Sequence, residues 1–293
     1  MAQSIDLVTK FQPILDEVYK TAAVSSILDS PSIPVDFAGA NVVKIFKTDP
    51  IGLGTYSRSA GYPAGQMVGT WETLTLATER GREFGIDRMD NEESLGMAFG
   101  TLAGEFMRTE VTPEIDAYRF AKYASWSGIQ TVAGATLSSS TVLAAIDAAQ
   151  AALDTYEVPA ERRLLFVSPS VARMISAAVT RMLGNEASVD RRVNSLDGTP
   201  IHVVPSGRFY TVCTLDAGAA VDAGGFSNGG VGINFMLIDP SAVIQVLKHA
   251  NLKIFDPDVN QSKDMYKVQY RLYHDAFVRD NYVKGVYLHK LAA

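Results

Sequence analysis

The chain has 293 residues, which is enough to bury a sizeable core as one large domain or two smaller ones. Its net charge of −6 argues against binding nucleic acid through the phosphates, because such binding needs a basic stripe. The single cysteine, Cys213, excludes an internal disulfide and a zinc site made of several thiolates. No run reaches the roughly 18 apolar residues of a membrane span, so we expect no association with a membrane. We also expect the protein to be made in a reducing cytoplasm.

Residues 1–40 are predicted to form an N-terminal arm. Four of its apolar side chains recur at helical spacing: Leu7, Phe11, Leu15 and Val18. This spacing predicts an amphipathic helix from Asp6, with a break or restart at Pro13, and the prolines after Ser30 end it.

Residues 41–89 are predicted to form an extended β-hairpin, with arms at Val42–Phe46 and Met67–Ile86 and a tip at Tyr56–Gln66. The second arm is rich in β-branched and aromatic residues, which favour strands. The hairpin has too few apolar residues to fold onto one core, and isolated two-stranded ribbons are only marginally stable. We therefore expect it to lie on another subunit, as in an assembly protein. The candidate contact residues are Arg58, Tyr62, Trp71, Glu72, Glu79, Arg80 and Arg82.

A long helix is predicted to follow the hairpin, beginning with Asp90 or Asn91 as its N-cap. One apolar stripe marks its buried face: Leu95, Phe99, Leu102 and Phe106. Pro113 predicts a kink or a new helix start, and the helix continues to about Ser125. A helix of this length would serve as a strut.

Residues 138–250 alternate between helical and strand patterns, which predicts one compact α/β domain. The expected helices are Thr141–Tyr156, Ser170–Leu183 and a short one from Asp239 to Leu247. The expected strands are Arg163–Val167, Ile201–Val204, Thr211–Leu215 and Gly232–Ile238.

The C-terminal part is predicted to be β-structure. Tyr266, Val268, Tyr270 and Leu272 alternate with polar residues, and Val283–Leu288 is expected to form a closing strand. These strands are expected to pack beside the long helix. That peripheral domain would then combine two distant segments, residues 90–137 and 251–293.

Gly225–Gly229 matches the five-residue pattern of a serine-hydrolase nucleophile elbow centred on Ser227. Such an elbow needs a hydrophobic strand before the serine and a helix after it, whereas both flanks here are rich in glycine. We interpret the motif as a surface loop, and a hydrolase using Ser227 is the alternative function from another class. The four histidines show no metal-ligand spacing and no phosphate-binding loop is present, so we expect no catalytic residues, metal or cofactor.

The order of these elements resembles the Hong Kong 97-like fold of the major capsid proteins of tailed bacteriophages, an α+β fold. The segments correspond to an N-terminal arm, extended loop, spine helix, axial domain and peripheral strands. Local echoes are the strand entering a helix at Leu165–Pro169, the turn at Leu196–Ile201 and the run Asp275–Arg279.

The resemblance implies a structural protein whose hexamers and pentamers close into an icosahedral shell around double-stranded DNA. It also implies a portal protein and, in some relatives, scaffolding and decoration proteins. The expected location is the virion capsid, assembled in the host cytoplasm. Only about forty residues precede the hairpin, so we expect a separate scaffolding protein or none. The nearest alternative is the shell of an encapsulating nanocompartment, which resembles the same fold.

Some proteins of that fold cross-link covalently through a lysine of the extended loop. No lysine occurs between Lys47 and Lys122 in this chain, so the tip and second arm cannot supply the amine. We predict that mature particles dissociate to single chains in hot denaturing detergent. A ladder of covalent multimers on that gel would contradict the prediction.

Overall fold

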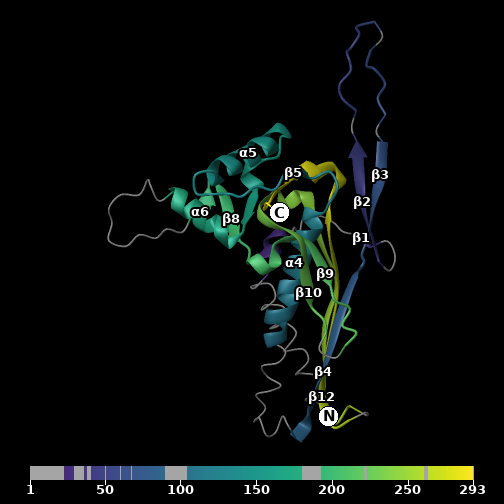
Figure 1. Ribbon diagram of the computed structural model, residues 1–293. Helices are drawn as coiled ribbons and strands as arrows, with labels where there is room; N and C mark the ends of the chain where they lie inside the picture. Colours follow the sequence, from purple (N-terminus) through teal and green to yellow (C-terminus); the bar gives the residue numbers. More distant parts are fainter. Residues whose placement is uncertain are drawn as a thin grey trace. The chain divides into compact units, whose positions relative to one another are not determined.

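The computed structural model describes residues 23–29, 36–37, 41–49, 51–59, 61–66, 68–89, 104–179, 193–220, 223–260 and 263–292. The chain divides into two units, which are described separately (Figure 1). The smaller, the ribbon unit, spans Pro31–Ala77, and the larger combines Met1–Ser30 with Thr78–Ala293.

The ribbon unit is a three-stranded antiparallel sheet of order β1-β2-β3. Its strands are β1 (Asp36–Phe37), β2 (Val42–Asp49) and β3 (Val68–Thr75). Phe46 of β2 lies directly opposite Trp71 of β3. The first arm and the beginning of the second arm therefore pair as the sequence predicts.

The second arm differs from the prediction of one continuous strand, because it is interrupted at Leu76 and Ala77. Its distal part is β4 (Thr78–Asp87), which pairs with β12 (Met265–Val278) rather than with β2. Cross-strand charges favour this partner, since Glu79 pairs with Arg271 and Glu83 with Lys267. The second segment of the larger unit therefore starts at Thr78, within the predicted second arm.

The first sheet of the larger unit has the order β11-β12-β4, with β11 at Val243–Phe255, and is antiparallel throughout. Its long strands run side by side in Figure 1. Val268, Tyr270 and Leu272 of β12 are buried, which confirms the predicted alternation. They pack against the helix that follows β4.

The helix is described over residues 104–124, and it packs on this sheet through Met107, Val111 and Ile115. It consists of a π-helical turn, Met107–Val111, continued by α4, Thr112–Ala124. Pro113 cannot donate a backbone hydrogen bond, and the widened turn just before it accommodates that loss without ending the helix. The predicted cap and the stripe residues Leu95, Phe99 and Leu102 lie outside the described residues.

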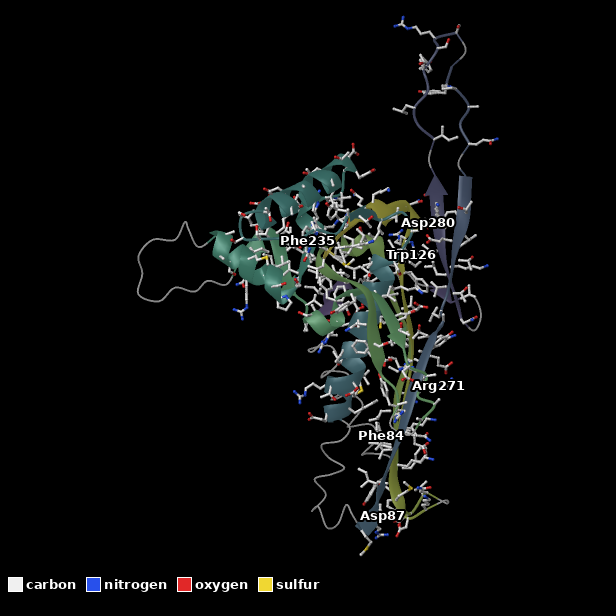
Figure 2. All side chains as sticks on the ribbon, in the orientation of Figure 1. Phe84, Asp87, Trp126, Phe235, Arg271 and Asp280 are labelled. Atoms are coloured by element: carbon white, nitrogen blue, oxygen red, sulfur yellow. The ribbon has the colours of Figure 1, made fainter. Side chains whose placement is uncertain are left out.

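The second sheet of the larger unit has the order β5-β13-β10-β6-β8-β7 along the described chain, with β9 also paired to β10. Its strands are β5 (Gln130–Val132), β6 (Leu164–Val167), β7 (Ser195–Leu196), β8 (Thr199–Val203), β9 (Tyr210–Leu215), β10 (Phe226–Ile238) and β13 (Val286–Lys290). The helices α5 (Val142–Thr155) and α6 (Pro169–Val179) contribute to a core that includes Phe235 of β10 (Figure 2). Short helical turns lie at Val24–Leu28, Ala160–Arg162, Ser206–Arg208, Pro240–Ala242 and Asp280–Gly285.

Two predictions for this region differ from the structure. The predicted helix from Asp239 to Leu247 is wrong, because only Pro240–Ala242 is helical and β11 begins at Val243. The Asp239 carboxylate accepts a hydrogen bond from the Ser241 N–H and stabilises one turn, after which β-branched residues favour a strand. The closing strand β13 pairs with β10 in the second sheet rather than lying with the long strands β11 and β12 of the first.

A buried carboxylate fixes the N-terminal segment to the larger unit. Asp116 of α4 is fully buried and accepts hydrogen bonds from the Ser25 N–H at 3.0 Å and the Ser25 hydroxyl at 2.6 Å. Arg208 donates to the same carboxylate at 3.1 Å, and Arg119 donates to the Ser25 hydroxyl at 3.0 Å. A carboxylate that accepts several hydrogen bonds in this way is held in place although it is buried. The predicted arm helix lies mostly outside the described residues, and Val24–Leu28 forms a 3-10 turn.

A second buried polar cluster joins α4 to both of its neighbouring strands. The Tyr118 hydroxyl donates to Asp275 at 2.8 Å and accepts from Thr78 at 2.7 Å. The ring of His274, only 1% exposed, lies edge-on to Tyr118 with centroids 5.3 Å apart. Burial lowers the pKa of His274 to about 3, and the positive charges of Arg119 and Arg80 add to the effect.

The buried imidazole predicts acid sensitivity. An unfolded chain binds a proton at His274 near its ordinary pKa of about 6.5, whereas the folded chain does not until about pH 3. Unfolding is therefore favoured progressively as the pH falls through this window, by at most roughly 5 kcal/mol at about 1.4 kcal/mol per pH unit. We expect His274→Gln to flatten the pH dependence of the free energy of urea unfolding of the unassembled chain. The exposed His249→Gln is the control, and equal slopes in both variants would contradict the assignment.

Candidate assembly surfaces

One face of the ribbon unit presents an aromatic pair to solvent. Phe46 is 49% exposed and Trp71 is 59% exposed, and their ring centroids lie 5.1 Å apart. The Phe46 ring also covers Gly69, where a Cβ atom would lie 2.5 Å from Cζ of that ring. On the opposite face Val43 and Leu74 are buried. We call the exposed pair of Phe46 and Trp71 the aromatic strip.

The tip of the hairpin presents a different chemistry. Backbone hydrogen bonds in both directions between Ser57 and Gly61 close it, and Gly61 adopts a φ of +79° that favours glycine. The rings of Tyr56 and Tyr62 lie 4.9 Å apart, and Tyr62 is 88% exposed. Arg58 is exposed on the same turn. Thus Arg58, Tyr62 and Trp71 lie where a neighbouring molecule could reach them.

The remaining predicted contact residues lie elsewhere. Glu72 is partly buried and opposes Ile45, so it lies on the ribbon face away from the aromatic strip. Glu79 accepts a hydrogen bond from Nε of Arg271 at 2.6 Å across the β4–β12 pair. Arg80 and Arg82 also belong to β4 and bind groups of their own chain. The seven residues are therefore divided between the two units, four in the ribbon unit and three in the larger unit.

Arg80 and Arg82 hold the loop that joins β9 to β10. Nε and Nη2 of Arg80 donate to the two carboxylate oxygens of Glu114 at 2.7 and 2.9 Å. The same guanidinium donates to the Asp216 carbonyl at 2.5 Å and to the Gly225 carbonyl at 3.0 Å. Arg82 donates to the Ala223 carbonyl at 2.7 Å. The bond to Glu114 raises the pKa of Arg80, so its guanidinium stays charged. We call this guanidinium, with its bonds to Glu114 and the two loop carbonyls, the Arg80 fork.

Sequence reasoning missed two contributors to these surfaces. Phe46 completes the aromatic strip. The pairing register of the two predicted arms, which sets Phe46 opposite Trp71, could have identified it as a surface residue. Glu110, exposed on the π-helical turn, lies beside Gly225 of the held loop. Nothing in the local sequence could place Glu110 there, because the two residues are far apart in the chain.

The residues of the nucleophile-elbow motif form part of a β-hairpin. Ser227 is an exposed residue of β10 and lies opposite Thr214 of β9, and strand rather than helix follows it. The surface-loop interpretation was therefore wrong in detail, but the elbow geometry is likewise not formed. Burial raises the pKa of the neighbouring Cys213 to about 11, which disfavours a thiolate.

The described part of the chain contains no group of three or more His, Cys, Asp or Glu residues placed to hold a metal ion. Within the same residues, no helix is long and apolar enough to cross a membrane.

Comparison with solved structures identifies the fold of this chain. No protein-family model matches the sequence, and no curated protein matches it. Solved structures do match: the capsid of cyanophage P-SCSP1u has a TM-score of 0.61 at 12% identity, covering 87% of this chain and 85% of that one. The mature capsid of bacteriophage PhiM1 gives 0.55 at 14% identity, covering 86% and 82%. This chain has the Hong Kong 97-like capsid fold.

The same fold extends beyond phages. A virus-like particle from Pyrococcus furiosus matches with a TM-score of 0.51 at 10% identity, covering 94% of this chain and 95% of that one. The predicted fold class is confirmed.

The Arg80 fork predicts a local change on substitution. Arg80→Lys cannot bind Glu114 and the two loop carbonyls together, so we expect a loss of about 1.5–3 kcal/mol in stability. Hydrogen exchange at described amides of the loop, such as Gly218 and Gly225, should accelerate more than elsewhere. Arg271→Lys is the matched control, because its ion pair with Glu79 is exposed and contributes about 1 kcal/mol or less. Unchanged loop exchange in Arg80→Lys would contradict the role of the fork.

Proposed function

We propose that this chain is the major capsid protein of a tailed phage, with hexamers and pentamers that close into an icosahedral shell around double-stranded DNA. The observation that carries the proposal is the exposed aromatic strip on an extended ribbon, in a chain with a capsid fold. Large aromatic side chains exposed together mark interaction surfaces, since their burial drives association.

The charge of the chain supports a shell protein rather than a protein that binds DNA tightly. The net charge of −6 gives little attraction for phosphates, which suits a container that does not bind its contents through the backbone. The shell would be built from copies of one chain, and its location would be the virion. A portal protein, a separate scaffolding protein and a decoration protein are further partners that we propose for the assembly.

Of the residues singled out in the sequence, Arg58, Tyr62 and Trp71 are the proposed intersubunit contacts. Their exposure supports this role. For Glu79, Arg80 and Arg82 we propose an indirect one, whereas Glu72, on the other face of the ribbon, stays a proposed contact. Arg80 and Arg82 hold the loop before β10 through its backbone carbonyls. Glu79 adds an ion pair between β4 and β12. These contacts would stabilise the surface that a neighbouring subunit contacts.

A nanocompartment shell is the second candidate, and the match to the Pyrococcus furiosus virus-like particle favours it. The two functions differ in contents and symmetry. A phage capsid would yield particles with double-stranded DNA and a portal at one vertex. A nanocompartment would yield particles with protein cargo and no portal. Nuclease-protected DNA in purified particles decides between them.

The aromatic strip predicts an assembly defect. Trp71→Ala removes a large apolar side chain from the proposed contact, which costs about 2 kcal/mol or more when such a residue lies at the centre of an interface. We expect the protein concentration needed for particle formation to rise about tenfold or more, as measured by sedimentation velocity.

Thr73→Ala is the matched control, because Thr73 lies on the same face of β3 and is exposed. It should assemble like the unaltered chain. If Trp71→Ala assembled equally well, the strip would not be a contact surface, whatever particles the chain forms.

A further inference from the structure

The larger unit contains a pocket between β4, the π-helical turn, β12 and the loop before β10. Its volume is about 580 Å³, within the range of about 300–1,000 Å³ for ligand sites. Its apolar lining includes Phe84, Phe106 and Tyr270, whose rings contact one another with centroids 4.8 and 6.0 Å apart. Phe84 projects from the long sheet in Figure 2. The pocket therefore offers an aromatic floor.

The charges around this floor are predominantly negative. Five carboxylates line the pocket against two guanidiniums: Glu83, Glu105, Glu110, Glu114 and Asp216 against Arg80 and Arg82. Both guanidiniums are already bound within the chain, Arg80 to Glu114 and Arg82 to the Ala223 carbonyl. Two further carboxylates are also paired, Glu83 with Lys267 and Glu105 with Arg108, so the negative charge that remains is that of Glu110 and Asp216. Glu110 is exposed and makes no ion pair with any described residue. An acidic rim over an aromatic floor suits a cation carried beside aromatic or apolar groups.

The tip of the hairpin has this complementary chemistry. Arg58 is the one charged residue between Asp49 and Glu72 in the sequence. It lies between Tyr56 and Tyr62, whose rings contact each other, and all three side chains are largely exposed. A narrow turn closed between Ser57 and Gly61 presents them together.

We propose that the tip of one copy docks in the acidic pocket of a second copy, with Arg58 facing Glu110 and the tyrosines meeting the aromatic floor. The contact is heterologous, because tip and pocket are different surfaces, so repetition around a symmetry axis closes a ring. This inference rests on the proposed shell and names the surface that receives the tip.

A charge exchange tests the pairing in the full-length chain. Arg58→Glu and Glu110→Arg should each raise the concentration needed for assembly at least about tenfold, because each places like charges in contact. The double variant R58E/E110R restores opposite charges and should return to within about threefold of the unaltered chain. Mixing the two single variants should restore six-membered rings, in which the variants alternate and the tip of each fits the pocket of the other, whereas a ring of five keeps one like-charge contact. A tip folded into the pocket of its own chain would give no rescue on mixing.

Lys253→Glu is the control, an exposed charge reversal on β11 outside both surfaces, and it should leave assembly unchanged. Thermal unfolding of the unassembled single variants should match the unaltered chain, because Arg58 and Glu110 are exposed. If the unaltered chain forms shells and Arg58→Glu does so equally well, only the docking proposal fails. If the unaltered chain stays monomeric at every concentration, the proposed function and the docking proposal both fail.

Discussion

The aromatic strip of Phe46 and Trp71 is the feature on which this account depends. One face of the three-stranded ribbon carries the buried side chains. The opposite face leaves the rings of Phe46 and Trp71 about half exposed. Such rings gain free energy only when a second surface covers them. The exposed rings therefore favour contact with a second surface, and the proposed shell would supply it from another copy.

The larger unit, in contrast, supplies its own core. Three clusters of buried residues occupy the space between the two sheets and their helices, and none includes a residue of the ribbon unit among those described. Buried polar groups then fix particular contacts: Asp116 holds the N-terminal segment, and Arg80 holds the loop before β10. The larger unit thus has a core of its own, whereas the ribbon unit leaves its aromatic strip exposed.

Local pattern was enough to predict most elements but not their partners. The alternation from Tyr266 to Leu272 has a single physical meaning, one buried face, and it identified β12 directly. The interruption at Leu76 could not be predicted from the sequence, because the pattern of β4 is that of a strand whichever partner it pairs with. Its actual partner, β12, lies nearly two hundred residues further along the chain. Among the candidate contacts, exposed Arg58, Tyr62 and Trp71 were recognisable from the hairpin, whereas Glu110 required the fold.

Electron cryomicroscopy of the purified full-length protein tests the central claim most directly. We expect closed shells in which residues 42–75 of each subunit lie across a neighbour, with Trp71 covered at the contact. A monomeric protein, or a shell in which Trp71 faces solvent on every subunit, would contradict it.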